Sequence, residues 1–255
     1  MGTAYAGFQR QPGKVTVQSV IEETIGKVTQ DRVRVDGSGR TDAGAHALAQ
    51  VIAFTTTSAL APEVLQRALN ATLPRDIAVT SVCEVGPGFH PRFDAHSRTY
   101  RYLIYNRRAP SPFWQRRAAH IRHALDHRAM AAAAGVLLGR HDFAAFVPVA
   151  QSAGSVRTMY RSDCSRQGDL IAVYLRASGF KQQMARCIAG TLVRAGEGKV
   201  DAAEMAAILA SKDRRRAGET MPPHGLYLAA VHYQEDKDTG ACLDGAPMQG
   251  FEEKG

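Results

Sequence analysis

Several segments of this chain alternate apolar and polar residues, and this two-residue period, typical of β-strands, limits the fold more than any other feature. The clearest segment is RTYRYLIYN, residues 98–106, in which Tyr100, Tyr102 and Ile104 share one face. Further strands are predicted in residues 31–35, 49–56, 77–82, 156–164, 169–177 and 226–233. A fold rich in β-sheet follows.

Helices are predicted between these strands, where apolar residues recur at helical spacing. They cover residues 17–28, 61–73, 128–138, 181–193 and 202–210. Because sheet and helix segments occur in two similar sets, we expect an α+β fold of two ferredoxin-like halves, with mainly antiparallel sheets and helices on one side. The N-terminal half should span residues 1–97 and the C-terminal half 98–233, and the polar, glycine-rich segment 234–255 is predicted to be a flexible tail.

The charge of the chain indicates a polyanionic partner. Lys and Arg number 32 against 24 Asp and Glu, which gives a formal charge of +8 and suits a nucleic acid. The four cysteines, Cys83, Cys164, Cys187 and Cys242, form no CxxC pair, and no apolar run is long enough to cross a membrane. These features predict a reduced protein of the cytoplasm.

The segment VDGSGRTDAGAHA, residues 35–47, joins two predicted strands and contains a candidate catalytic residue, Asp42. Its glycines permit positive φ angles and close approach to a ligand. Asp42 could cap a turn, a common role for Asp beside Gly. It could also be a nucleophile if a cation such as Arg40 keeps its carboxylate ionised. The segment is neither a GxGxxG loop nor a phosphate loop. Its residues alone therefore do not decide whether Asp42 caps a turn or acts as a nucleophile.

Five segments, in order along residues 3–233, resemble motifs of the tRNA pseudouridine synthase A family. GRTDAGAHA is similar to the family segment that carries the catalytic aspartate. The other four are AYAGFQRQ with TVQSVIEE, FHPRFDAHSRTYRYLIYN, FKQQMARCIAGTLVRAGEGK, and GLYLAAVHY. They resemble, respectively, the family's N-terminal region, its base-contacting segment, its Phe-x-x-x-Met-x-Arg-x-x-x-Gly helix and its closing strand.

The resemblance implies the pseudouridine synthase fold and an isomerase that detaches uracil from C1′ of ribose and rejoins it through C5, without metal or other cofactor. Asp42 would be the nucleophile, attacking either C6 of uracil or C1′. Arg40 and Arg186 would keep its carboxylate ionised, and Arg40 would also suit an RNA phosphate.

The resemblance also implies the residues that hold the base. Tyr100 would pack against the flipped uracil, and Leu226 and Tyr227 would line the pocket. Tyr102 and Tyr105 are interpreted as structural strand residues, and His46 as a residue that shapes the loop rather than an acid or base.

The family's usual substrate implies an anticodon stem-loop of tRNA, at positions 38 to 40, and a homodimer as the working unit. Two basic runs, residues 107–128 and 212–216, fit such a partner, although a solvated helix face also explains the second. A metal site built from His120, His123 and His127 is not expected, because their ligand set is incomplete. The alternatives are a noncatalytic RNA-binding protein or tRNA folding helper with the same fold, and an Asp-dependent hydrolase, which the basic runs disfavour.

Two differences from the family pattern stand out. Phe8 occupies a position where tryptophan is usual, which is a mild change. Family members also have a strand before the segment that matches GTAYAGFQRQ. Because a missing strand leaves backbone groups and apolar surface uncovered, we expect a version extended upstream by such a strand to be more stable and more active.

Overall fold

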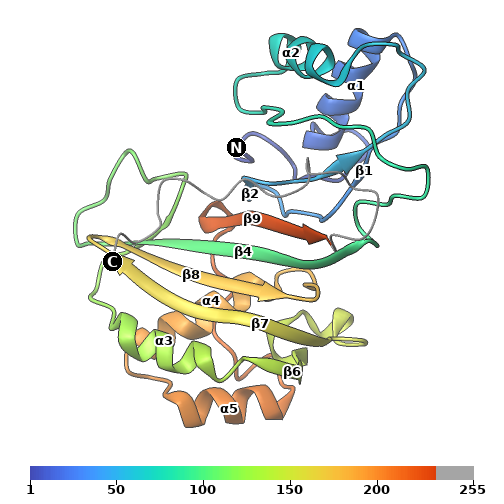
Figure 1. Ribbon diagram of the computed structural model, residues 1–255. Coiled ribbons are helices and arrows are strands. Elements are labelled where there is room, and N and C mark those ends of the chain that lie inside the picture. The colour runs from blue at the N-terminus through green and yellow to red at the C-terminus, as the bar shows by residue number, and fades with distance from the viewer. Residues whose placement is uncertain (234–255) are drawn as a thin grey trace. The chain divides into compact units, whose positions relative to one another are not determined.

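The computed structural model describes residues 1–233; the segment 234–255, for which the sequence predicts a flexible tail, lies outside the described residues. The chain divides into two compact units. Unit 1 contains Met1–His96 and the chain from Ala229 onward, and unit 2 contains Ser97–Leu228. Figure 1 colours the chain along its length. The predicted α+β class with antiparallel strands is confirmed.

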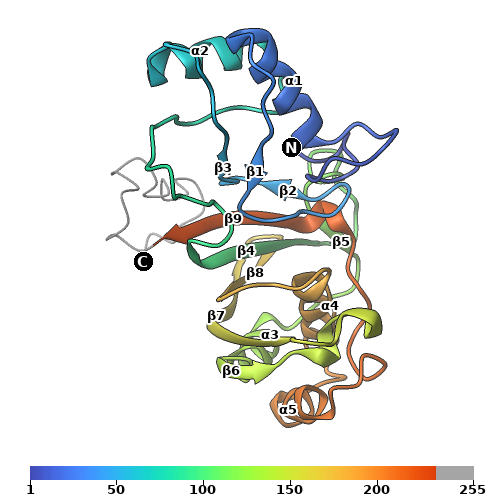
Figure 2. The ribbon, with the colours of Figure 1, turned by 90° about the vertical axis from the view of Figure 1, so that its right-hand side faces the viewer.

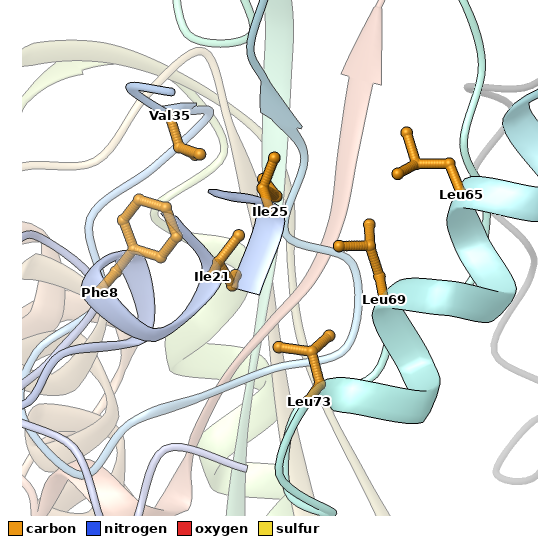
Figure 3. Close-up of a cluster of buried hydrophobic side chains, with 7 residues drawn as sticks. All are labelled: Phe8, Ile21, Ile25, Val35, Leu65, Leu69 and Leu73. Carbon is orange, nitrogen blue, oxygen red and sulfur yellow. The ribbon is translucent and has the colours of Figure 1, made fainter. Parts of the chain in front are cut away.

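Unit 1 is organised around two helices, α1 (Val17–Thr29) and α2 (Pro62–Thr72). A reciprocal hydrogen-bond pair between Thr16 and Ser19 caps the start of α1, and Pro62 occupies the first turn of α2, where its missing N–H is not needed. Their apolar faces meet in a core cluster that contains Phe8, Ile21, Ile25, Val35, Leu65, Leu69 and Leu73. Figure 3 shows Leu65 and Leu69 of α2 pointing toward the isoleucines of α1.

The strands that lie wholly in unit 1 are short. β1 (Asp36–Gly37) pairs antiparallel with β3 (Ile52–Ala53), and β2 (His46–Ala47) follows the glycine-rich loop. The predicted strands 31–35 and 77–82 are therefore wrong, and only two residues of the predicted strand 49–56 are paired as a strand.

Side chains from the helices take over the hydrogen bonds that strand neighbours would make. Val35 donates its N–H to Glu22 Oε1 (3.1 Å), and its carbonyl accepts from Gln18 Nε2 (3.0 Å). Val79 donates its N–H to Asn70 Oδ1 (2.7 Å), and its carbonyl accepts from Asn70 Nδ2 (2.8 Å). Buried backbone groups need partners, and polar residues of α1 supply them at Val35. At Val79 the bonds are exposed, and Asn70 of α2 makes them in place of a strand neighbour. The valines still pack on the core, which explains their strand-like pattern.

Unit 2 contains an antiparallel sheet in which β4 (Ala95–Asn106), β8 (Leu170–Ala177), β7 (Val156–Gln167) and β6 (Gly139–Asp142) follow one another in that order. β5 (Ala119–Ile121) runs parallel to the end of β4. β9 (Leu226–Tyr233) begins in this unit, after a 3₁₀ turn η3 (Pro223–Gly225). Two further 3₁₀ turns are η1 (Ala144–Phe146) and η2 (Val149–Gln151). Figure 2 shows β4, β8 and β7 from the side.

Three helices complete unit 2: α3 (His127–Gly135), α4 (Met184–Gly196) and α5 (Ala202–Ser211). α3 packs against β7 and against both other helices. α4 is buried around most of its circumference, so it forms the centre of the unit. It begins three residues later than the sequence predicts, because Gln183 has a φ of 62°, which is not helical. No helix within residues 1–233 is long and apolar enough to cross a membrane.

Two glycines let another segment pass directly over α4. A Cβ added to Gly190 would lie 1.9 Å from the carbonyl oxygen of Glu219, and one added to Gly218 would lie 2.5 Å from the backbone of Gly190. Thr191 Oγ1 accepts a hydrogen bond from the N–H of Gly218 (2.8 Å), which holds the two segments together. The contact is therefore between backbones, with no room for side chains.

This close approach leads to a stability prediction. Gly190→Ala should lower the free energy of unfolding by about 1 to 3 kcal/mol or more, because the new methyl group overlaps a backbone atom that cannot rotate away. The matched control is Gly135→Ala in α3, where an added Cβ meets nothing within 4 Å and the change should be neutral or stabilising by up to about 1 kcal/mol. Chemical denaturation of both variants tests this, and equal stabilities would contradict it.

Candidate functional site

Asp42 lies at the first position of a tight turn. The N–H of Ala45 donates to the carbonyl oxygen of Asp42 at 3.0 Å, and Gly44 has a φ of 79° at the third position, as a type II turn requires. The turn is closed by a backbone carbonyl, so it does not need an aspartate at position 42. Asp42 is half-buried and Arg40 is exposed.

The N-terminal segment holds this loop on both sides of Asp42. Phe8 donates its N–H to Thr41 O (3.2 Å), and Gly44 donates to Tyr5 O (3.3 Å). Gly7, with a φ of 93°, approaches so closely that an added Cβ would lie 2.7 Å from Thr41 O. The position of Asp42 therefore depends on the backbone of residues 5–8.

His46 reinforces the same contact from the far end of the loop. Its side chain is buried, and its Nδ1 accepts a hydrogen bond from the N–H of Gly2 at 2.9 Å. A Cβ on Gly2 would lie 1.7 Å from Ala45 O, so only glycine fits there. This is the loop-shaping role that the sequence predicts for His46.

The other candidate site residues belong to unit 2, and Tyr100 is the first of them. Tyr100 is buried in β4, and its ring packs edge-on against Phe180, with 4.8 Å between ring centroids. Tyr102 lies two residues further along the same strand and donates its hydroxyl to Pro222 O at 2.7 Å. Burial raises the pKa of Tyr102, so this hydroxyl stays protonated at neutral pH.

Arg186 is held by the segment that follows α5. Its Nε donates to Met221 O at 2.6 Å, and the N–H of Met221 donates back to Arg186 O at 3.3 Å. Burial lowers the pKa of His224, and the positive charge of Arg186 also lowers it. A hydrogen bond with the backbone of Ala118 acts in the opposite direction. The segment Met221–His224 thus connects Arg186 with Tyr102.

Leu226 and Tyr227, predicted to line the pocket, are both buried at the start of β9. Tyr227 packs in a cluster with Leu103, Tyr105 and Ala118, and the Arg101 guanidinium carbon lies 5.3 Å from the centre of its ring. Burial raises the pKa of Tyr227, and its hydroxyl donates to Arg117 O at 2.6 Å. Tyr227 therefore connects the start of β9 to the basic segment after β4.

The predicted site residues of unit 2 contact residues that the sequence analysis did not identify as candidates. Phe180 opens the FKQQMARC segment, so its place in that motif could have drawn attention to it. Met221 contributes only a backbone carbonyl and N–H, for which residue type gives no signal. His224 precedes GLYL directly, yet a lone histidine in a loop is not informative by itself.

Two of the three histidines in residues 120–127 contact protein groups. His120 Nε2 lies 2.7 Å from Arg107 O, and His123 Nε2 lies 2.7 Å from Glu197 Oε1. Within residues 1–233, no group of three His, Cys, Asp or Glu side chains is arranged to hold a metal ion.

The cations of the second basic run, residues 212–216, bond to other groups of unit 2. The members of this run bond to protein groups: Lys212 to Asp142, Arg214 to Gly218 O and Thr220 Oγ1, Arg215 to Asp213, and Arg216 to Glu204. These contacts favour the structural explanation of this run over a role in RNA binding. They also hold the segment that leads to Met221.

Comparison with known proteins finds one family whose model matches residues 1–94 and 133–234, described as tRNA pseudouridine synthase. Similar proteins include the tRNA pseudouridine synthases A of Geotalea daltonii, 43% identical over 91% of this chain and 96% of that protein, and of Citrifermentans bemidjiense, 41% identical over 93% and 96%. The protein of that name from Brevibacillus brevis is 44% identical over 91% and 96%.

The contact between residues 5–8 and the Asp42 loop leads to a second prediction. Gly7→Ala should lower the free energy of unfolding by about 1 to 3 kcal/mol beyond the cost of a positive φ, and should speed amide hydrogen exchange in residues 41–45. Gly13→Ala is the control, since Gly13 also has a positive φ (68°) but an added Cβ meets nothing within 4 Å. If both variants show the same exchange in this loop, the N-terminal segment does not hold it.

Proposed function

Since this chain belongs to the tRNA pseudouridine synthase family, whose members are isomerases that convert uridine to pseudouridine in tRNA, we propose that Asp42 is its nucleophile. The observation that carries the proposal is the place of Asp42 in the GRTDAGAHA motif, at the first position of a turn that the backbone of residues 5–8 holds in place.

The reaction needs a carboxylate in its ionised form. In the proposed mechanism the Asp42 oxygen attacks either C6 of uracil or C1′ of ribose. The N1–C1′ bond breaks, the base turns, and a C5–C1′ bond forms. The bond between the Asp42 oxygen and the substrate also breaks, which restores the free carboxylate. C5 then loses its proton and N1 gains one, so that the product is an isomer of the substrate. We propose that Asp42 performs this chemistry without a metal or other cofactor.

The residues of unit 2 are proposed to bind the same uridine. The Tyr100 ring, oriented by its edge-on contact with Phe180, suits the wall of a base pocket, and Leu226 would extend that wall. Arg186, whose guanidinium is oriented by Met221 O, would bind the substrate as a cation. Tyr227 would support this pocket indirectly through its contacts in the cluster with Leu103.

Arg40 has a separate proposed role. Because it is exposed and lies two residues before Asp42, it would bind a phosphate of the RNA backbone beside the target nucleotide.

The proposed substrate is the anticodon stem-loop of tRNA, at positions 38 to 40, and the proposed working unit is a cytoplasmic homodimer. Incubation of unmodified tRNA transcripts with the purified chain should place pseudouridine at one or more of these positions and nowhere else in the molecule. Transcripts in which cytidine replaces uridine at positions 38 to 40 are the control. Pseudouridine confined to another arm of the tRNA would refute this substrate assignment.

Asp42→Asn gives the sharpest test of the nucleophile. The amide has nearly the shape of the carboxylate but cannot attack, so pseudouridine formation should fall below detection while tRNA binding remains within about threefold of wild type. Asp36→Asn, at an exposed position before the same loop, should keep full activity. Turnover by Asp42→Asn would exclude the proposed role, and a wild-type chain that binds tRNA but never modifies it would favour the noncatalytic alternative.

A further inference from the structure

The segment between β4 and β5 forms a cationic turn on unit 2. From residue 107 to residue 125 the sequence contains five arginines, Arg107, Arg108, Arg116, Arg117 and Arg122, and no Asp or Glu. Residues Pro112–Arg117, called the basic turn below, lie in the middle of this stretch. Such a run is complementary in charge to a polyanion.

The basic turn is a structured element. Trp114 donates its N–H to Ser111 O (3.1 Å), and the Trp114 carbonyl accepts from Arg117 and Ala118, at 2.9 and 3.0 Å. The Trp114 side chain packs on the cluster that contains Tyr227, and the Tyr227 hydroxyl bonds to Arg117 O. The turn is therefore held from inside by a tryptophan and from the side by a tyrosine.

The residue next to this tryptophan points the other way. Phe113 is 81% exposed, more than any other large apolar side chain described. A hollow of about 430 Å³ is lined by Pro112, Phe113, Gln115, Arg116 and Arg117. An ordered turn thus places an aromatic ring in solvent beside two arginines, and this pairing of ring and cation is typical of contacts with single-stranded nucleic acid.

We propose that Phe113 stacks on an unpaired nucleobase of the tRNA substrate, while Arg116 and Arg117 bind the phosphates on either side. The proposal rests on the proposed function, because RNA is the partner. The target uridine is assigned to Tyr100, so the base on Phe113 is a different one. A second copy of the chain is a poorer occupant, since each copy carries a formal charge of +8 and the acid-free turn would meet a like-charged protein.

The test measures the Kd for a fluorescently labelled, full-length tRNA transcript. Phe113→Ala and Phe113→Leu should each raise Kd about 5- to 100-fold, because neither side chain can stack, whereas Phe113→Trp should bind as tightly as wild type or tighter. Val149→Ala, at another apolar side chain that is 77% exposed, should not change Kd. Melting temperatures equal to wild type would show that every variant is folded.

Two results would overturn the proposal. If Phe113→Leu binds like wild type, the contact is not stacking, and if Phe113→Ala also does, the turn does not contact the RNA. Replacement of Phe113 by the photoreactive benzoylphenylalanine provides a second measurement, in which cross-links to tRNA are expected and cross-links only to a second copy would exclude RNA as the occupant. Kd reports binding and not the rate of modification, so a failure here is distinct from a failure of Asp42 to catalyse.

Discussion

The candidate site depends on a contact between two pieces of backbone in unit 1. Residues 2–8 lie against residues 41–46 so closely that Gly2 and Gly7 cannot carry side chains, and the hydrogen bonds of this contact flank Asp42. A loop rich in glycine loses much conformational entropy on ordering. The hydrogen bonds to the neighbouring segment offset part of this loss and fix the backbone on both sides of Asp42.

In unit 2 a similarly close backbone contact lies on the path of the chain to its contact with Arg186. The backbone of Gly218 and Glu219 crosses α4 at Gly190, and Thr191 holds the crossing. The chain then reaches Met221, whose carbonyl orients the Arg186 guanidinium. Because α4 is buried around most of its surface, its first turn cannot shift without disturbing the core. Both candidate functional groups thus lie beside close backbone contacts, which the side chains of His46 and Thr191 reinforce.

These contacts explain which features the sequence could predict. The helices α1 to α5 and the long strands of unit 2 follow from clear apolar periods. The proposed role of Asp42 rests on its motif and stays a prediction. The strands around Val35 and Val79 were wrong because glutamine, glutamate and asparagine side chains on the helices satisfy those backbone groups. The role of Met221 was not predictable, because a backbone carbonyl has no signature in residue type. Apolar pattern reports burial, whereas pairing depends on partners distant in sequence.

The two basic runs, residues 107–128 and 212–216, show that the number of cations in a segment does not by itself predict what those cations bind. Both are rich in arginine, yet the run 212–216 bonds to Asp142, Glu204, its own Asp213 and the carbonyl of Gly218. The stretch 107–125, which contains the basic turn, has no Asp or Glu of its own, and its Arg107 pairs with Asp169. The basic turn differs from the run 212–216 because Trp114 and Tyr227 hold it in place and it carries an exposed aromatic ring beside its arginines. This combination is the reason why the basic turn is the proposed RNA contact.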